Sequence, residues 1–458
     1  MNRTFTIKKY LVLLIFVLLP FNGLPYQFQF IGELGYEGAF FGFLISLFIT
    51  ILIFRGRWFV PKNLAFYLIV LFIFWIFISG IVNYNDILSN YFKGRSGLSK
   101  FLTQSMVIIL SCFTIVFYYN LFKDLNFNSI KNAIIISCII PFIYSFIEIL
   151  NFLNITIARN LLLLLEEYIH SFAVYNYVLS EEPKLRSVSG EASWFGTYIS
   201  FLFPWVLNIL IAKKDNKLFN YVILIYLLIL VYFTFSRTVY SIVFIQLICF
   251  FLLYFLYEKN YKTKIRLIFS SAFMTILAIL FLTDNLFSNI FTVLSSLSDP
   301  ENLSNVARFS SQIAALKMWI DAPIFGVGIG QYGFYMPIYI SQKSLILSHE
   351  IQEWVTNSIN SPWPPVHGLY SRILAEAGII GLILWVSSWI FLIYKLLHIL
   401  NKYQTEKLIR LDIISIITTI IGTLLIGFNI DTFRNQTFYI SFSMALIYLY
   451  YLNKARSH

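Results

Sequence analysis

Charged side chains are scarce in this sequence of 458 residues. Asp, Glu, Lys and Arg together make up 12% of the chain, whereas soluble domains contain about 25%. Hydrophobic residues make up 59%, which excludes an ordinary soluble protein. The apolar residues form long continuous runs without strand-like alternation, and a backbone in lipid must satisfy its hydrogen bonds internally. We therefore expect an all-α, polytopic membrane protein that forms one integral membrane domain over residues 1–458.

Cysteine is also scarce. The three cysteines, Cys112, Cys138 and Cys249, each lie inside an apolar run, so they predict neither a disulfide framework nor a metal site. The polar loops contain no Asp-x-Asp or histidine-rich cluster, and we expect no metal and no cofactor. Basic residues form no stripe with interleaved aromatic residues, so we expect no nucleic-acid partner.

The apolar runs predict about twelve transmembrane helices, near 10–30, 38–54, 64–82, 101–121, 132–153, 194–212, 219–235, 238–257, 265–283, 368–398, 411–429 and 435–452. An even number of spans places both termini on the same side of the membrane. The loops on that side contain 21 of the 33 Lys and Arg residues. The positive-inside rule then predicts that both termini are cytoplasmic.

The opposite, outer side is enriched in arginine, with 5 Lys and the seven residues Arg95, Arg159, Arg186, Arg237, Arg308, Arg372 and Arg434. Arginine carries a permanent charge on a planar fork that binds phosphate through two parallel hydrogen bonds. This excess favours a phosphate- or carboxylate-bearing ligand at the outer face. The alternative is that individual arginines extend to lipid headgroups or pair with acidic residues.

Two outer loops are long: 154–193 and 284–367. The first begins with apolar residues at helical spacing, which predicts a helix in the membrane interface, and it ends with Glu191 directly before a span. A buried Glu191 would pair with an arginine or accept a proton. Arg237 lies between two spans that are joined by almost no loop, and an ionisable residue at that depth is a candidate functional residue.

The longer loop contains Arg308 on a predicted amphipathic helix and then Gly328, Gly330 and Gly333, which match the pattern G-x-G-x-x-G. No strand precedes these glycines, so we reject a dinucleotide site and predict tight backbone turns. His367 follows the proline-rich segment 362–366 and precedes a span. It is either a general base or a hydrogen-bonded structural residue.

Several of these motifs occur together in one order. They are Arg186-x3-Gly190-Glu191-x-Ser193, then Ser236-Arg237-Thr238, then Arg308 with the segment 320–330, then His367 and the segment Glu376-Ala377-Gly378-Ile379-Ile380-Gly381. Over residues 183–400 the chain resembles the O-antigen ligase and polymerase superfamily. The resemblance implies a bacterial inner-membrane glycosyltransferase that acts at the periplasmic face on sugars linked to undecaprenyl pyrophosphate. Its functional positions match Arg186, Arg237 and His367.

The resemblance gives the residues a chemical hypothesis. Breaking the bond from the anomeric carbon to pyrophosphate leaves a diphosphate whose charge needs fixed cations. We expect Arg186 and Arg237 to bind it, with Arg308, Arg372 and Arg434 as further candidates. His367, or alternatively Glu191, would take the proton from the acceptor hydroxyl.

The resemblance also implies the partners: a lipid-linked glycan donor and acceptor, membrane lipids and a chain-length regulator. We favour a polymerase of repeat units because the loops are aromatic and polar enough to stack on sugars. The alternatives are a ligase that transfers the glycan to lipid A-core, and a flippase or transporter of lipid-linked sugars. Transporters usually show internal repeats and broken helices at the bilayer midplane, and the sequence has no similar halves.

Overall fold

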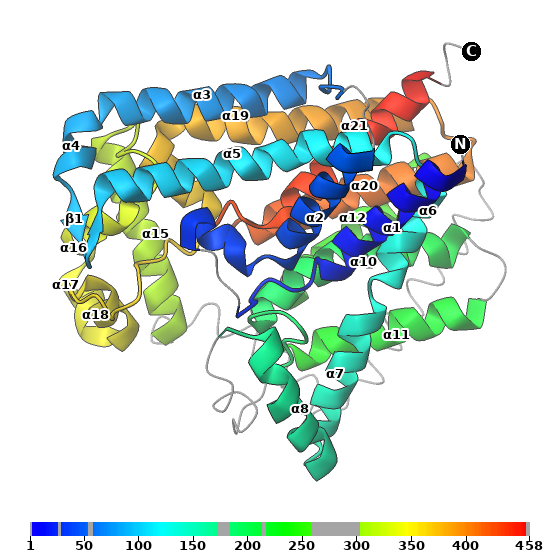
Figure 1. Ribbon diagram of the computed structural model, residues 1–458, viewed down its shortest axis with the longest axis horizontal. Helices are drawn as coiled ribbons and strands as arrows, with labels where there is room; N and C mark the ends of the chain where they lie inside the picture. Colours follow the sequence, from blue (N-terminus) through cyan, green and yellow to red (C-terminus); the bar gives the residue numbers. More distant parts are fainter. Residues whose placement is uncertain are drawn as a thin grey trace.

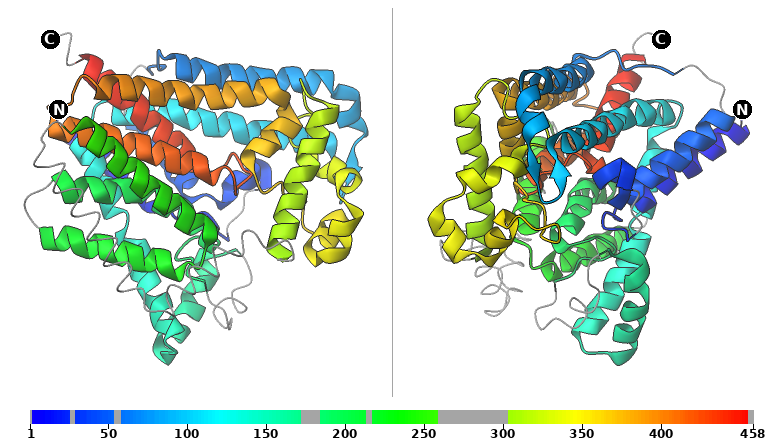
Figure 2. Two further views of the ribbon diagram at one scale, coloured as in Figure 1. Left: turned by 180° about the vertical axis from the view of Figure 1, so that it is seen from behind. Right: turned by 60° about the vertical axis from the view of Figure 1, so that its left-hand side comes forward.

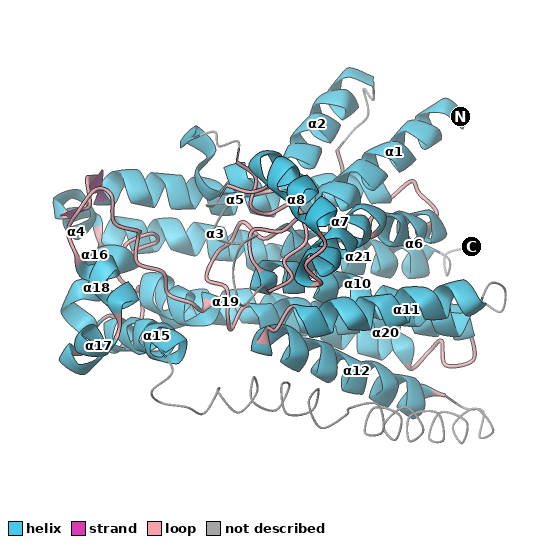
Figure 3. Cartoon of the chain, turned by 90° about the horizontal axis from the view of Figure 1, so that it is seen from below, coloured by secondary structure: helices cyan, strands magenta, loops and turns pink. Residues whose placement is uncertain are grey.

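The computed structural model of the protein describes residues 2–25, 29–53, 58–171, 184–212, 217–258 and 303–454. Within these ranges the chain is almost wholly helical. The helices are α1 (Asn2–Leu18), η1 (Gln29–Tyr36), α2 (Gly38–Ile53), α3 (Leu64–Val82), α4 (Tyr84–Ser89), α5 (Gly97–Phe122), α6 (Phe127–Ile136), α7 (Ile139–Phe152), α8 (Thr156–Ile169), α10 (Ala192–Ala212), α11 (Lys217–Phe233), α12 (Arg237–Tyr257), α15 (Leu303–Asp321), α16 (Tyr332–Tyr339), α17 (Gln342–Leu347), α18 (His349–Val355), α19 (Leu369–Leu400), α20 (Lys407–Ile426) and α21 (Gln436–Lys454). One antiparallel hairpin, β1 (Tyr91–Phe92) and β2 (Arg95–Ser96), lies near α4 and α16 (Figure 3).

Seven of the described helical segments are long and apolar enough to cross a membrane: α3, α5, the segment 127–152 formed by α6 and α7, α10, α12, α19 and α20. This confirms an all-α polytopic membrane protein. The spans expected at 38–54 and 219–235 correspond to the shorter apolar helices α2 and α11. The span expected at 10–30 is α1, which ends at Leu18 because Pro20 disfavours helix just before it. The span expected at 265–283 lies outside the described residues, so the number twelve stays a prediction.

The long helices run roughly in one direction, with α3, α5 and α19 side by side (Figure 1). Both termini lie at one end of this bundle, and α15 to α18 lie at the other end (Figure 1). The described part of the large loop is therefore at the opposite end from the termini. A core of buried aliphatic and aromatic side chains joins the long helices, and a second, smaller core joins α15, α16 and α18.

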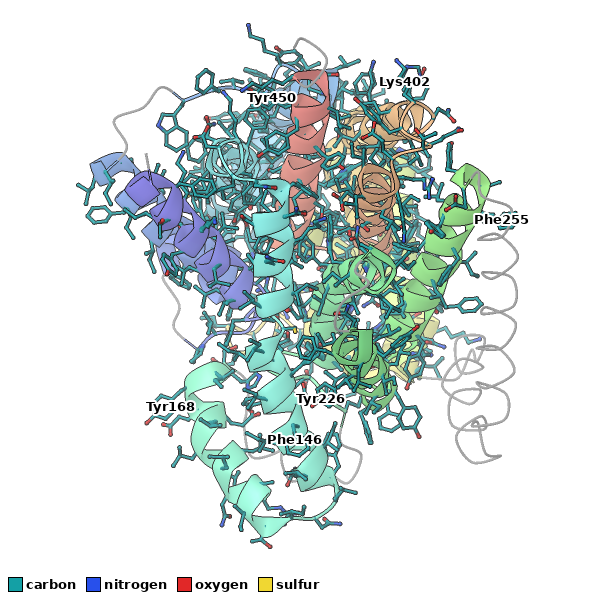
Figure 4. The ribbon with its side chains drawn as sticks, turned by 90° about the vertical axis from the view of Figure 1, so that its right-hand side faces the viewer. Phe146, Tyr168, Tyr226, Phe255, Lys402 and Tyr450 are labelled. Carbon is teal, nitrogen blue, oxygen red and sulfur yellow. The ribbon has the colours of Figure 1, made fainter. Side chains whose placement is uncertain are left out.

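The helix expected in the first long loop is α8. It pairs with α7 in a hairpin that projects from the side of the bundle (Figure 2), and Tyr168 on α8 points away from the bundle (Figure 4). Ala158, Leu162 and Glu166 form the buried face of α8. The base of the hairpin is attached to α11, because the Tyr226 hydroxyl donates to the carbonyl of Phe142 at 2.9 Å.

Helix α19 is broken at Gly378, where the backbone has φ +68° and ψ −172°. The segment 323–330 inserts into this break. The amides of Val327 and Gly328 donate to the carbonyls of Ala375 and Glu376 at 2.8 and 3.0 Å, and Ile379 donates to the carbonyl of Pro323 at 2.9 Å. In an unbroken α-helix, each of those two carbonyls would accept a hydrogen bond from the amide four residues later in the chain. The loop therefore supplies the hydrogen bonds that the helix loses.

Two of the three glycines predicted to form tight turns, Gly328 and Gly330, have positive φ, as does Gly326. Gly333 instead lies in helix α16, so the prediction of a turn there was wrong. Helix α3 fixes the loop from the other side. The Ser79 hydroxyl donates to the carbonyl of Phe325 at 2.6 Å, and the Trp75 indole donates to the carbonyl of Ala377 at 2.7 Å. The motifs 320–330 and 376–381 thus form one structural unit together with α3.

We predict that Gly378→Ala destabilises the protein. The left-handed backbone costs a non-glycine residue about 1–2 kcal/mol, and a Cβ at this position would lie 2.0 Å from the carbonyl oxygen of Ile324. The melting temperature in detergent, followed by loss of the monodisperse chromatographic peak, measures the effect.

Gly94→Ala is the matched control. Gly94 has φ +72°, but a Cβ there would meet only the side chain of Ile359, at 3.1 Å. The control should lose only the backbone contribution. Equal losses in the two variants would contradict a special role for the close approach at Gly378.

Candidate active site

His367 is held in a strained conformation at the entrance to α19. Its backbone φ is +58°, a value that residues other than glycine rarely adopt. The Asp431 carboxylate accepts hydrogen bonds from the amides of Val366 and His367 at 2.5 and 3.3 Å. The Gln312 side chain donates to the carbonyl of His367 at 2.7 Å. Strain of this kind persists only when the surroundings fix it, and it is common at functional sites.

The segment 427–435, between α20 and α21, organises the site. The carbonyl of Gly427 accepts from the amide of Leu369 at 2.7 Å, directly after His367. Arg372 donates to the carbonyl of Asp431 at 2.6 Å, and the Thr432 hydroxyl donates to Glu33 at 2.6 Å. This one connection therefore contacts the start of α19, its first turn and η1.

Arg308 lies near His367, and Arg237 lies near Arg308. Arg308 projects from α15, one turn before Gln312, and donates to the side-chain oxygen of Asn429 at 3.4 Å. Arg237 begins α12 after the short connection that the sequence predicts, and its charge interacts with that of Arg308. Among the described residues, no carboxylate lies within salt-bridge distance of Arg308. The charge of Arg308 thus acts both on the histidine and on Arg237.

The environment of His367 keeps its imidazole neutral at pH 7. Burial and the positive charge of Arg308 lower the pKa of His367 to about 4, although Asp431 acts in the opposite direction. The Nε2 atom is buried and has no hydrogen-bond partner among the described residues. The ring packs against the indole of Trp354, with their centroids 5.4 Å apart. A neutral imidazole with an unused ring nitrogen is able to accept a proton.

Arg372 lies behind His367 in a fully bonded polar network. Its guanidinium donates to Glu376 at 2.9 Å and to Gln104 at 2.8 Å, and Gln104 donates to Glu33 at 2.8 Å. The amide of Tyr332 donates to the second oxygen of Glu376 at 3.1 Å. The Arg372 and Glu376 side chains are only 9% and 2% exposed. Arg372 is therefore a buried residue that stabilises the structure of the site.

Arg434 connects this network to the N-terminal region. It lies 3.1 Å from Glu37, and its guanidinium is 4.3 Å from the centre of the Trp194 ring. Burial raises the pKa of Glu37 to about 8, and Arg434 offsets only part of that rise. Burial also acts to raise the pKa of Glu33, but Arg372 and Arg434 hold it at about 2. Glu33 is therefore the carboxylate that balances these two arginines at neutral pH.

Arg186 belongs to a different cluster, in which it is 4% exposed. Its guanidinium forms an ion pair with Glu166 on α8 and donates to the carbonyl of Gly190 at 3.1 Å. Glu166 also accepts from the hydroxyl of Tyr144 at 2.7 Å. This arginine holds the α7–α8 hairpin against the segment that precedes α10.

Glu191 is exposed, which differs from the buried position considered in the sequence. Its carboxylate accepts a hydrogen bond from the hydroxyl of Ser193 at 3.4 Å. The side chain points into open space at the start of α10 because the buried turn 187–190 ends just before it.

Among the predicted site residues, the structure therefore brings Arg308 near His367, and Arg237 near Arg308. Arg372 is connected to His367 through Asp431. Sequence reasoning missed Asp431, Gln312 and Asn429. Their signals were modest: Gln312 lies one turn after Arg308, and Asn429 and Asp431 interrupt the apolar runs of the last two spans. In the described ranges, no group of three or more His, Cys, Asp and Glu side chains has the arrangement of a metal site.

We predict that His367 titrates near pH 4. Arg308→Gln should raise the pKa of His367 because it removes a nearby positive charge. Asp431→Asn should lower it because it removes the opposing negative charge. Nuclear magnetic resonance of histidine-labelled protein in nanodiscs measures these values, and His349, whose side chain is 83% exposed, serves as the internal reference. A normal titration of His367 near pH 6.5 would contradict this description of the site.

Comparison with known proteins finds one family match within the chain. Residues 222–386 match the family described as O-antigen ligase. The matched segment contains Arg237, Arg308 and His367, whereas Arg186 and Asp431 lie outside it. No curated protein matches the sequence. This domain supports the resemblance of the chain to the O-antigen ligase and polymerase superfamily, whose members are enzymes that act on glycans.

Proposed function

We propose that this protein polymerises oligosaccharide repeat units linked to undecaprenyl pyrophosphate, at the periplasmic face of the bacterial inner membrane. The observation that carries the proposal is Arg308, whose charge acts both on a neutral His367 and on a second arginine, Arg237. A diphosphate leaving group needs fixed positive charge, and an acceptor hydroxyl needs a proton acceptor.

Arg308 is the strongest candidate for binding the diphosphate. Arg186, Arg372 and Arg434 each lie beside a buried carboxylate, whereas the side-chain partner of Arg308 among the described residues is the neutral Asn429. No carboxylate of the described residues balances its charge, which favours an anionic ligand there. Arg237 adds a second charge from a different helix, and the repulsion between the two guanidinium groups is relieved when an anion binds between them.

The proposed reaction is a single displacement. The acceptor hydroxyl attacks the anomeric carbon, the bond from that carbon to the pyrophosphate oxygen breaks, and the bonding electrons leave with the diphosphate. The proton passes from the hydroxyl to Nε2 of His367, and Asp431 stabilises the imidazolium that forms. A bound diphosphate counteracts the charge of Arg308, so donor binding makes His367 a stronger base.

Ligase activity is the second candidate, and the description of the matched family favours it. A ligase uses the same donor but transfers the glycan to lipid A-core. The donor site proposed here serves either reaction, so the acceptor decides between them.

The experiment is reconstitution of the purified protein in liposomes with lipid-linked repeat units, without nucleotide or added metal, and analysis of products on a gel. We predict a ladder of products, and we predict that Arg308→Ala and Arg237→Ala each lower the rate by about 100- to 1,000-fold. Arg308→Lys should recover part of the activity because it retains charge without the two-pronged geometry.

Arg159→Ala is the matched control, since Arg159 lies on α8 and donates to Asn151. It should leave the ladder unchanged. Transfer only after addition of lipid A-core would identify a ligase. If neither product formed, the proposed function would be wrong.

Separate variants identify the base. We predict that His367→Gln lowers the rate by about 100- to 10,000-fold while changing KM little, because it removes proton transfer. Glu191→Gln should have little effect because Glu191 is exposed and bonded to Ser193. The reverse result, with loss of activity only in Glu191→Gln, would move the role of base to Glu191.

A further inference from the structure

Helix α15 has two apolar faces. The inner face, which includes Ala307, Ala314 and Met318, is buried in the small core, as the sequence predicts. The outward face carries a second set of large apolar side chains at helical spacing. Its members, with their exposed fractions, are Phe309 (50%), Ile313 (51%), Leu316 (39%), Ile320 (67%) and, just after the helix, Ile324 (50%). We call these five residues the α15 stripe.

One end of the α15 stripe meets the surface that faces lipid. The backbone of Ile324 packs against the break in α19, where its carbonyl approaches Gly378. Just beyond the break, the spanning part of α19 exposes Ile383 (54%) and Ile390 (61%). The stripe therefore ends beside a helix that is long and apolar enough to cross the bilayer and that exposes apolar side chains.

The other end of the α15 stripe meets the cationic site. Phe309 follows Arg308 directly in the sequence. Gln312, on the side of α15 that carries Arg308, donates to the carbonyl of Phe428, and Phe428 is 66% exposed. The Phe428 ring packs against Tyr370 with centroids 4.7 Å apart. An exposed apolar surface thus extends to Arg308, whose side-chain partner among the described residues is the neutral Asn429.

We propose that the α15 stripe holds the polyprenyl chain of the lipid-linked donor while its diphosphate lies at Arg308. This inference rests on the proposed function and adds the path of the lipid. A polyprenyl diphosphate joins a long apolar chain directly to an anion. The stripe offers an apolar surface next to the cationic Arg308, so it complements both parts of such a ligand. Ordinary phospholipid chains would cover the stripe without any dependence on Arg308.

The test uses a polyprenyl diphosphate that carries a photoreactive group in its chain, added to the full-length protein in liposomes. We expect crosslinks within residues 309–324 that excess unlabelled polyprenyl diphosphate prevents and excess polyprenol or phospholipid does not. Arg308→Ala, and the double variant Ile313→Ser with Ile320→Ser, should each lower this specific labelling on the order of tenfold.

Ile346→Ser on α17 is the matched control, because Ile346 is 76% exposed and lies outside the stripe. It should label as the unchanged protein does, which separates loss of the stripe from general damage. Labelling of α15 that only phospholipid prevents, or specific labelling elsewhere, would overturn the inference. Because the readout is binding, specific labelling without any glycan product would reject the proposed function and keep the lipid path.

Discussion

The break in α19 at Gly378 is the constraint on which the rest of the site depends. A helix that continued through this position would pair the carbonyls of Ala375 and Glu376 internally and leave the segment 323–330 without its anchor. The break instead exposes these carbonyls to Val327 and Gly328. The first turns of α19, which carry Arg372 and Glu376 and follow His367, are thereby fixed against α3 and α15. The geometry around His367 therefore depends on the break in α19 at Gly378.

The polar groups around this break differ in how completely their charges are balanced. Arg372, Glu376, Gln104 and Glu33 form a chain in which each member donates to or accepts from the next, so their burial is compensated. Arg308 departs from this pattern, since its described partner is the amide oxygen of Asn429. In a protein that otherwise pairs its buried arginines with carboxylates, a charge left with a neutral partner indicates a place for an anionic ligand.

The sequence predicted those parts of the protein that depend on composition and local period. The helical class, most helix positions, the turn at Arg237 and the inner face of α15 follow from apolar runs and spacing. The turns at Gly328 and Gly330 were predicted correctly, but the insertion of this loop into α19 depends on contacts between segments about 50 residues apart. The same limit explains Arg186, because Glu166 precedes it by 20 residues on another element. It also explains Asp431, whose role depends on a backbone more than 60 residues away.

His367 shows why strain and charge belong together in this site. Its left-handed backbone is maintained by Asp431 and Gln312, and the same Asp431 carboxylate is the charge that favours the protonated ring. Arg308 opposes that protonation until an anion neutralises it. A site of this kind keeps its base neutral and weak while it is empty, and strengthens the base when the donor diphosphate binds as proposed. In the proposed reaction, donor binding and proton transfer are thus coupled through the charge of Arg308.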